Sequence, residues 1–576
     1  MLRFILNFIF NSVLKMCTFY QFMILLWMAA QTECYLNFIK ENVTLTIDQG
    51  MLFGKKSLDY SNEIFYSFIG IPFAKPPIGE LRFKAPKPAE KWSGIYDATK
   101  LRPICPQTIL SEKNVFKIEG LEHNENCLFI NIHSKMSSQL KPVMVYITGG
   151  AFLYGSIFES RYGPEFLVSN DIVLVLPAHR LNIFGFLAID DPKYGIHGNM
   201  GFKDQVLSLK WIQKNIHHFG GDPKQVTIVG ESSGALSAYV LCLSPLAKGL
   251  FHRAILESPV MGNILRKTEA TSFMEITTPL NCSTKNWNEI VKCINESSTE
   301  NLLIGLEELL EKKIFYNEIL NSSKTCKITF FTMNPFTIEK KNHNSFLSEQ
   351  PESIMKKGKF YKVSMMMGCD TNDMAVFRHD YLFPLNFTDY RVLIPVDIKI
   401  DLASDEAFEL GKQIKQAYYG NQTPSNELID PFLEYVTDLW VVKNTYKYAK
   451  VFSKTTPVYF YEFNYHTNLI TRPGRYVEHA DEIPYLFYEN GTTPENMKET
   501  SEEYIGIHRM TKLWTNFVKT GNPNSVNDPL LNVKWLPIES NKFNYLKISS
   551  NLELKENPPG KHMKFWEDIY KEYNSN

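Results

Sequence analysis

The segment Gly230-Glu231-Ser232-Ser233-Gly234 sets a serine between two glycines, in the G-x-S-x-G pattern typical of nucleophilic serines. The β-branched run Val226–Val229 before it predicts a buried strand, and Ala235–Leu241 after it predicts a helix. In such a strand–turn–helix the serine adopts a strained backbone geometry that only small flanking residues allow. We therefore expect the hydroxyl of Ser232 to be a nucleophile beside the positive end of a helix.

A serine hydroxyl barely ionises near neutral pH, so it needs a general base, which in turn needs an orienting acid. Of the 13 histidines, His479 is the best placed, because it lies in a loop after the strand expected over Val458–Phe463 and follows Ser232 in the chain. For the acid we favour Asp373, with Asp370 as second candidate, since both follow an expected strand that ends at Gly368.

The attacked carbonyl needs hydrogen-bond donors at the oxygen where negative charge develops. Gly149 and Gly150 directly follow an expected strand and can bring unhindered N–H groups to that oxygen, and Ser233 can supply a third. Taken alone, the two glycines would equally suit an ordinary turn. Their position after a strand that precedes the serine favours an oxyanion hole.

Short apolar runs around these residues predict the elements that position them. Runs of this kind, each read as a buried strand, lie at Val143–Ile147, Asp171–Leu176, Val226–Val229 and Ala254–Leu256. The amphipathic segment Asp204–His217 predicts a helix between two of them, so the pattern favours an α/β fold with a parallel sheet and crossover helices. The less regular region 268–348 is interpreted as helical insertions on the ligand-facing side. No linker divides the chain, so residues 34–576 are expected to form one domain.

Composition argues against several partners. The 61 basic and 62 acidic residues give a net charge of -1, so no general attraction to nucleic acid is expected. No cysteine or histidine spacing matches a metal site, and we expect neither a metal nor another cofactor. The expected partner is a small-molecule substrate, and the sequence does not indicate an oligomeric state.

The amino terminus predicts secretion. Phe22–Ala30 is an apolar run that ends in small residues, which fits a signal peptide over about residues 1–33 and is too short for a membrane span of ~20 residues. An uncleaved anchor is the alternative, and Met16 is an alternative start. After cleavage no transmembrane anchor is expected.

Sequons and cysteines agree with an extracellular glycoprotein. N-x-S/T sequons begin at Asn42, Asn281, Asn295, Asn321, Asn386, Asn421 and Asn490. Among the 9 cysteines, the pairs Cys105 with Cys127 and Cys282 with Cys293 would each close a short surface loop, as oxidised pairs do in secreted proteins. Cys242 is expected to be a buried thiol.

Several segments together resemble the type-B carboxylesterase/cholinesterase family of the α/β-hydrolase fold, and most of all its secreted insect carboxylesterases. These segments are FIGIPFAKPPIGELRF at 68–83, ENCLFINI at 125–132, GGAF at 149–152, HFGGDPKQVTIVGESSGA at 218–235, HADEIPYLF at 479–487 and LWTNFVKTGNPN at 513–524. The resemblance implies a central, mostly parallel twisted sheet with helices on both faces and helical insertions over the active site.

The resemblance also implies roles for single residues. It makes Ser232 the nucleophile and His479 the base, and it assigns the oxyanion hole to Gly149, Gly150 and Ser233. It implies disulfides Cys105–Cys127 and Cys282–Cys293. It further implies structural ion pairs, which are Arg82 with Glu125 and Arg180 with Asp204.

The sequence departs from the family pattern at three places. Thr148 stands where the family usually has histidine, Asn372-Asp373-Met374 replaces D-E-G, and the serine motif reads GESSG instead of GESAG. Asp373 is one methylene shorter than the usual acid, so a shift of ~1 Å would be needed to reach His479, and ~1 Å errors can cost ~10²-fold in rate.

We therefore expect a secreted serine carboxylesterase that forms an acyl-enzyme on Ser232, with a rate that rises with pH near the reference pKa of His479, ~6.5. The alternative is a catalytically weak or silent cholinesterase-like binding or adhesion protein. The segment from Cys105 to Cys127 contains no tryptophan, so the choline site of cholinesterases is not expected. Juvenile hormone esterases usually have glutamine before the serine, and Glu231 argues weakly against that subclass.

Overall fold

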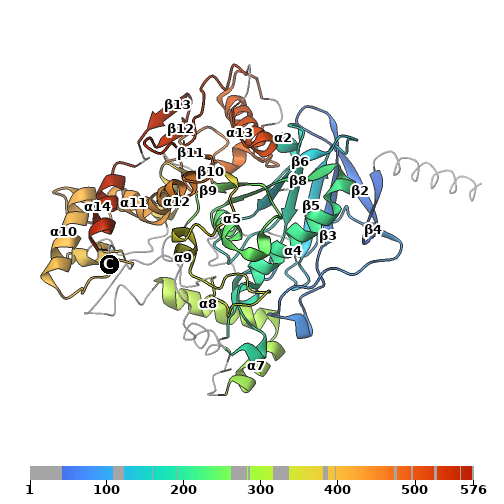
Figure 1. The fold of residues 1–576 in the computed structure, drawn as a ribbon, viewed down its shortest axis with the longest axis horizontal. Helices are drawn as coiled ribbons and strands as arrows, with labels where there is room; N and C mark the ends of the chain where they lie inside the picture. Colours follow the sequence, from blue (N-terminus) through green and yellow to red (C-terminus); the bar gives the residue numbers. More distant parts are fainter. Residues whose placement is uncertain are drawn as a thin grey trace, which may run out of the picture.

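The structure of the chain is a computed structural model (Figure 1). It describes residues 42–573, except 108–121, 159, 190, 261–279, 281, 283–285, 316–335, 380–386, 396, 472–475, 495–496, 525–527 and 558–559. The expected signal peptide and the sequons at Asn281, Asn321 and Asn386 lie outside these described residues.

A single twisted sheet runs through the described part of the chain (Figure 1). In spatial order its strands are β1 (Asn42–Ile47), β2 (Gly50–Leu58), β3 (Ile64–Pro72), β5 (Phe129–Ser134), β7 (Val173–Pro177), β6 (Lys141–Ile147), β8 (Gly221–Glu231), β9 (Arg253–Glu257), β10 (Ser364–Asp370), β11 (Val458–Phe463), β12 (Asn544–Ile548) and β13 (Leu552–Glu556), and β4 (Ile95–Asp97) pairs with β2. The strands from β7 to β12 pair in parallel, whereas both edges of the sheet are antiparallel. The prediction of an α/β fold with a mostly parallel central sheet is confirmed.

The apolar runs form central strands because both of their faces are covered. Successive side chains of a strand point to opposite faces. In β6, Val143, Val145 and Ile147 join one buried core, while Met144 and Tyr146 join the other. A continuous apolar run is therefore what a strand covered on both sides requires.

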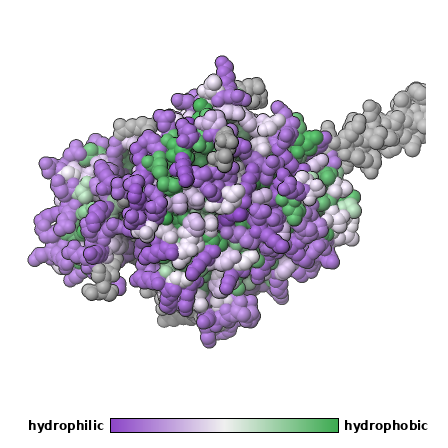
Figure 2. Space-filling view, turned by 45° about the horizontal axis from the view of Figure 1, so that its top comes forward, coloured by the Kyte–Doolittle hydropathy of each residue, from purple (hydrophilic) through white to green (hydrophobic). Residues whose placement is uncertain are grey.

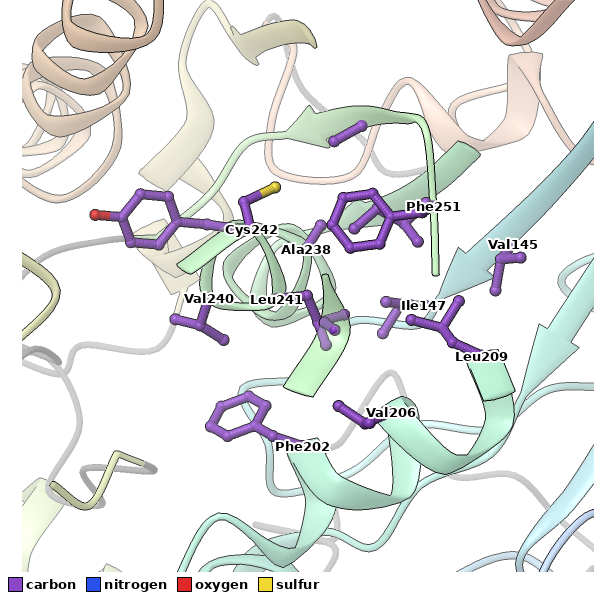
Figure 3. Packing of buried hydrophobic residues seen from close by; sticks show 14 of the residues in the cluster. Val145, Ile147, Phe202, Val206, Leu209, Ala238, Val240, Leu241, Cys242 and Phe251 are labelled. Carbon is purple, nitrogen blue, oxygen red and sulfur yellow. The ribbon is translucent and has the colours of Figure 1, made fainter. Parts of the chain in front are cut away.

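The helices divide between the two faces of the sheet and two outlying clusters (Figure 1). Helices α4 (Met200–Asn215), α5 (Ser233–Leu243), α9 (Pro351–Lys356) and α12 (Lys443–Ser453) contribute to the first core, and α2 (Glu165–Val168) and α13 (Glu502–Thr520) to the second. The outlying clusters contain α10 (Asp405–Tyr419), α11 (Asp430–Thr437) and α14 (Met563–Tyr573), and α3 (Asn182–Phe186), α7 (Trp287–Glu296) and α8 (Thr299–Phe315). Figure 3 shows α4 and α5 side by side, with Val206 and Leu209 of one facing Leu241 of the other.

The insertion expected over residues 268–348 is helical where it is described. Helices α7 and α8 pack against α3 through a separate apolar cluster, and Asn286 caps α7 by accepting the N–H of Asn288 at 3.0 Å. Residues 336–350 are irregular. In the described part of the chain, α7 and α8 therefore pack on α3 and neighbouring loop residues through apolar side chains.

The exterior is mostly hydrophilic, with small apolar areas scattered over the face shown in Figure 2. Among the described residues, no helix combines the length and the apolar character that crossing a membrane requires. The structure contains both disulfides, Cys105–Cys127 and Cys282–Cys293. Cys242 is buried and free, as expected.

Candidate active site

Ser232 lies at the sharp turn between β8 and α5. Its backbone has φ 57° and ψ -122°, a conformation that L-residues rarely adopt and that stores strain at functional sites. The neighbouring glycines make the turn possible, since a Cβ at Gly230 would lie 2.4 Å from the carbonyl carbon of Gly234, and one at Gly234 would lie 2.0 Å from the oxygen of Ile147. The N–H of Ser232 donates to the carbonyl of Glu257 in β9 at 2.9 Å. The predicted strand, turn and helix are therefore all present.

The structure brings Asp373 and His479 into contact across 106 residues of sequence. Nδ1 of His479 is hydrogen-bonded to Oδ1 of Asp373, and the backbone N–H of His479 donates to the carbonyl of Asp373 at 2.9 Å. Because the backbone bond already holds the two residues together, the shorter aspartate reaches the imidazole. The contact between the two side chains is therefore made despite the missing methylene.

The second oxygen of Asp373 is held independently of the histidine. Oδ2 accepts the hydroxyl of Ser258 at 2.6 Å and the N–H of Asp370 at 3.0 Å, and the whole side chain is buried. Asp370, the second candidate for the acid, points elsewhere: its own Oδ2 accepts the N–H of Asp481 at 3.3 Å. The geometry therefore favours Asp373 over Asp370 as the partner of His479.

The other ring nitrogen of His479 faces Glu231, which directly precedes Ser232. Nε2 lies 3.0 Å from Oε1 of Glu231, so the imidazole sits at the serine turn. Burial opposes a charge on the imidazole, but the negative charges of Glu231 and Asp373 outweigh it and raise the pKa of His479 well above 6.5. The expectation of a pKa near the reference value is therefore wrong, because the sequence did not reveal that two carboxylates flank one ring.

This arrangement predicts a measurable pH effect of Glu231→Gln. Only neutral imidazole can accept a proton from serine, so kcat/KM of the native enzyme should rise with pH through a midpoint above 6.5. Removing the charge of Glu231 weakens the stabilisation of the imidazolium, and the midpoint should move to lower pH. Profiles of kcat/KM from pH 5 to 10 measure this midpoint, with Glu80→Gln, a change at an exposed residue, as control. An unchanged or higher midpoint in Glu231→Gln would contradict this account.

The segment after β6 lies against the serine turn. A Cβ at Gly149 would lie 2.6 Å from Oε2 of Glu231 and 3.1 Å from Cβ of Ser232, so no side chain fits there. Gly150 has φ 119°, and its carbonyl accepts the N–H groups of Leu153 and Tyr154 at 2.9 and 3.1 Å. The structure thus places Gly149 and Gly150 beside Ser232 in a tight turn.

Ser233 lies in the first turn of α5, where backbone N–H groups have no partner within the helix. Its hydroxyl accepts the N–H of Phe152 at 3.3 Å, which ties the glycine segment to the helix. Within the described ranges, the N–H groups of Gly149, Gly150 and Ala151 donate no hydrogen bond. Ala151, with φ 56°, was not singled out from the sequence. Its small size directly after two glycines was the available signal.

Two further carboxyl groups are buried close enough to Glu231 to interact with its charge. Glu257 and Glu482 are completely buried, and Nε1 of Trp514 donates to Glu257. Burial raises the pKa of Glu257 well above its usual value. Burial, followed by the charge of Glu231, raises the pKa of Glu482 to about 8. Glu482 therefore holds a proton at neutral pH in the folded chain.

The proton on Glu482 predicts a loss of stability at alkaline pH. In the unfolded chain this carboxyl ionises near 4.5, whereas the folded chain keeps the proton until about pH 8. Between these values the folded state binds more protons, so its stability falls as pH rises. Glu482→Gln cannot ionise, and its Tm should fall less between pH 5 and 8 than that of the native protein. Calorimetry checks this, with exposed Glu539→Gln as control, and equal slopes in all three proteins would contradict it.

The remaining predicted residues lie away from this centre. Both ion pairs implied by the resemblance are present, since Nε of Arg82 donates to Glu125 at 2.9 Å and Nε of Arg180 donates to Asp204 at 2.8 Å. The sequon residues Asn295, Asn421 and Asn490 are exposed, and Asn42 is partly buried in β1. No three His, Cys, Asp or Glu side chains in the described residues converge so that they could hold a metal ion.

Comparison with known proteins identifies the family. Residues 41–566 match the profile of the carboxylesterase family. Carboxylesterase 5A of Canis lupus familiaris is 31% identical over 87% of this chain and 84% of its own length. Juvenile hormone esterase of Heliothis virescens is 32% identical over 84% and 86%, and Esterase FE4 of Myzus persicae is 30% identical over 90% and 91%.

A solved structure shares the fold. The crystal structure of juvenile hormone esterase from Manduca sexta, with OTFP covalently attached, superimposes with a TM-score of 0.78 at 26% identity, covering 93% of this chain and 100% of that one. A serine at a strained turn beside a histidine–aspartate pair, the profile match and these relatives lead to one conclusion. The chain belongs to the carboxylesterase family and is a carboxylic ester hydrolase.

Proposed function

We propose that the protein is a secreted serine carboxylesterase that hydrolyses small carboxylic esters through an acyl-enzyme on Ser232. The observation that carries the proposal is the hydrogen-bonded pair of Asp373 and His479, whose other ring nitrogen, Nε2, lies at the serine turn, 3.0 Å from Oε1 of Glu231. An aspartate at Nδ1 leaves Nε2 as the nitrogen that exchanges protons with the serine and the substrate.

In the first half of the reaction, Oγ of Ser232 attacks the ester carbonyl while His479 takes its proton. The oxygen becomes negative, and the N–H groups of Gly149, Gly150, Ala151 and Ser233 are the donors available for it. Losing one such donor typically slows catalysis by ~10²–10³-fold. His479 then protonates the leaving alkoxide, and the alcohol departs.

In the second half, His479 takes a proton from water, which attacks the acyl carbon. The bond to Ser232 breaks, the carboxylic acid leaves, and the proton returns to the serine oxygen. During each step the imidazolium lies between the carboxylates of Asp373 and Glu231, which stabilise its charge. The same stabilisation makes His479 harder to deprotonate at rest, so we expect greatest activity at mildly alkaline pH.

Secretion is part of the proposal and rests on separate observations. Phe22–Ala30 has the pattern of a signal peptide, and residues 34–576 would form the mature single domain. The two disulfides and the exposed sequons at Asn295, Asn421 and Asn490 suit an oxidising compartment where glycans are added. The expected glycoprotein carries glycans at some of its sequons.

Covalent labelling tests the proposal. A fluorophosphonate should add once to the secreted protein, and peptide mass spectrometry should locate the adduct on Ser232. The Manduca sexta enzyme, which has OTFP covalently attached, supports the use of a covalent probe on this fold. Hydrolysis of p-nitrophenyl acetate should stop in step with labelling. A folded sample that is not labelled and hydrolyses p-nitrophenyl acetate no faster than buffer alone would instead be the silent binding protein.

A further inference from the structure

A small cavity lies behind the segment that carries the proposed oxyanion donors. Its volume is about 30 Å³, and its walls include Thr148, His179, Arg102 and the stretch Gly155–Phe158. Thr148 directly follows β6 and His179 lies two residues after β7, so the cavity sits at the carboxyl ends of neighbouring parallel strands. None of Ser232, Asp373 and His479 is among the residues that line it.

Three polar groups at this cavity lack partners within the described part of the chain. His179 is only 6% exposed and its ring makes no hydrogen bond. Thr148 is 4% exposed and its hydroxyl makes none. Nε of Arg102 is buried without a partner, although the same guanidinium donates through Nη2 to the carbonyl of Asp97 at 2.6 Å. Such groups need hydrogen bonds when they are withdrawn from bulk water.

The oxyanion segment, residues 148–155, contains the proposed backbone donors, and both of its ends line the cavity. Thr148 directly precedes Gly149, and a Cβ at Gly155 would lie 2.6 Å from the carbonyl oxygen of Gly149 and 3.6 Å from Oγ1 of Thr148. Gly155 is in turn clamped by the side chain of Gln107, which accepts its N–H at 2.9 Å and donates to its carbonyl at 3.0 Å. Whatever fills the cavity therefore touches both ends of the segment.

The volume of the cavity limits the size of the molecule that it can bind. One water needs about 10–15 Å³ measured in this way, so about 30 Å³ holds two waters and excludes an ester. Neutral imidazole, hydroxyl and guanidinium Nε supply both donors and an acceptor, which is the lining that a water prefers over a dry void. Burial lowers the pKa of His179 to about 4, so its ring is neutral and keeps one accepting nitrogen.

We propose that this cavity binds two ordered waters that bridge Thr148, His179 and Arg102, and that these waters hold the oxyanion segment in its catalytic position. The proposal rests on the proposed esterase function. Thr148 and His179 are positioning residues in it, because they act through the backbone donors of Gly149 to Ala151 and do not touch the substrate. The two waters would fill space beside Thr148 that the larger side chain of a histidine would take up.

Thr148→Val tests the role of the hydroxyl, because valine has the same shape and cannot hold the waters. Displacement of catalytic donors by ~1 Å can cost ~10²-fold, so a partial displacement should lower kcat by about 10-fold while KM changes less than about 2-fold. Thr148→Ser should retain most of the native kcat. Each kcat is expressed per site titrated with a fluorophosphonate, so that a loss of folded protein does not count as a loss of rate.

The matched control is Thr227→Val. Thr227 in β8 is also buried and its hydroxyl has no hydrogen-bond partner among the described residues, but it does not line the cavity. Its kcat should equal that of the native enzyme. His179→Phe, which removes both ring nitrogens at similar size, is the second variant should Thr148→Val not fold, and we expect a similar loss of kcat.

A native kcat in Thr148→Val or in His179→Phe would overturn the positioning role. A crystal structure of the native protein at high resolution tests hydration without any reference to activity. Two waters within hydrogen-bond distance of Thr148 and His179 support the proposal, and a dry cavity or a bound anion overturns it. If the native protein neither reacts with the fluorophosphonate nor hydrolyses esters, the proposed function fails, and the crystallographic result still decides whether the cavity is hydrated.

Discussion

Replacing Ser232 by alanine is expected to lower kcat for p-nitrophenyl acetate by about 10⁵–10⁶-fold, the scale on which loss of a catalytic serine acts in serine hydrolases. The hydroxyl of Ser232 lies at the strained turn before α5, and alanine at this position leaves the turn without a nucleophile. Stability should change little or improve, because methyl replaces hydroxymethyl without requiring a new backbone conformation. Initial rates at pH 8 and a melting curve measure both effects.

Ser233→Ala is the matched control for this prediction. The neighbouring serine contributes its backbone N–H, which alanine keeps, and its hydroxyl only accepts the N–H of Phe152 at 3.3 Å. Its kcat should therefore stay within about 10-fold of the native value, because one neutral hydrogen bond contributes about 1 kcal/mol. Native turnover in Ser232→Ala, or a label located on a residue other than Ser232, would exclude the proposed nucleophile.

The sequence was sufficient for the elements nearest the serine. Val226–Val229 is the inner part of β8, and the glycines at 230 and 234 could be interpreted because the turn has a steric requirement that other residues violate. At this turn, the residues that the chemistry requires and the residues that the backbone geometry requires lie next to each other in the sequence.

Contacts between distant segments were harder to predict. The residues alone ranked Asp373 above Asp370 but kept both as candidates, since both follow the same strand and they are only three positions apart. The structure distinguishes them because Asp370 uses its N–H to hold Asp373, while Asp373 alone reaches His479. Side-chain direction after a strand depends on the turn that follows, and the sequence does not encode that turn in a recognisable residue pattern.

Glu231 shows the same limit for electrostatics. Its place before the serine is obvious from the sequence, but its distance from His479 depends on how β8 and the loop that carries the histidine meet. The buried carboxyls Glu257 and Glu482 likewise come from separate segments. Their pKa values depend on burial and on mutual distance, and neither quantity can be inferred from composition.

In the proposed mechanism, the two carboxylates that flank the imidazole of His479 have opposite effects on catalysis. They stabilise the imidazolium that forms when serine attacks, and they also favour a proton on the resting histidine, which must be neutral to act as base. The balance depends on pH, so the enzyme should gain rate as pH rises. Asp373 has a second task that Glu231 cannot share, because only Asp373 contacts Nδ1 and so selects the tautomer.

Asp373→Asn should therefore lower kcat by about 10⁴-fold, as the equivalent change does in serine proteases. The two donors at Oδ2, Ser258 and the N–H of Asp370, should bind the amide oxygen of the asparagine. The amide NH₂ would then point at Nδ1 of His479 and hold the tautomer with the proton on Nε2, which cannot accept a proton from serine. Rates measured at pH 8 and above should not recover, because deprotonation does not correct the tautomer.

Asp370→Asn is the control, because the change keeps the N–H that holds Asp373 and removes no contact with His479. Its kcat should stay within about 10-fold of the native value, since a neutral amide in place of a buried carboxyl leaves the histidine tautomer unchanged. A loss of about 10⁴-fold in Asp370→Asn together with native activity in Asp373→Asn would reverse the assignment of the acid. Equal, small losses in both variants would mean that His479 keeps its tautomer without either carboxylate.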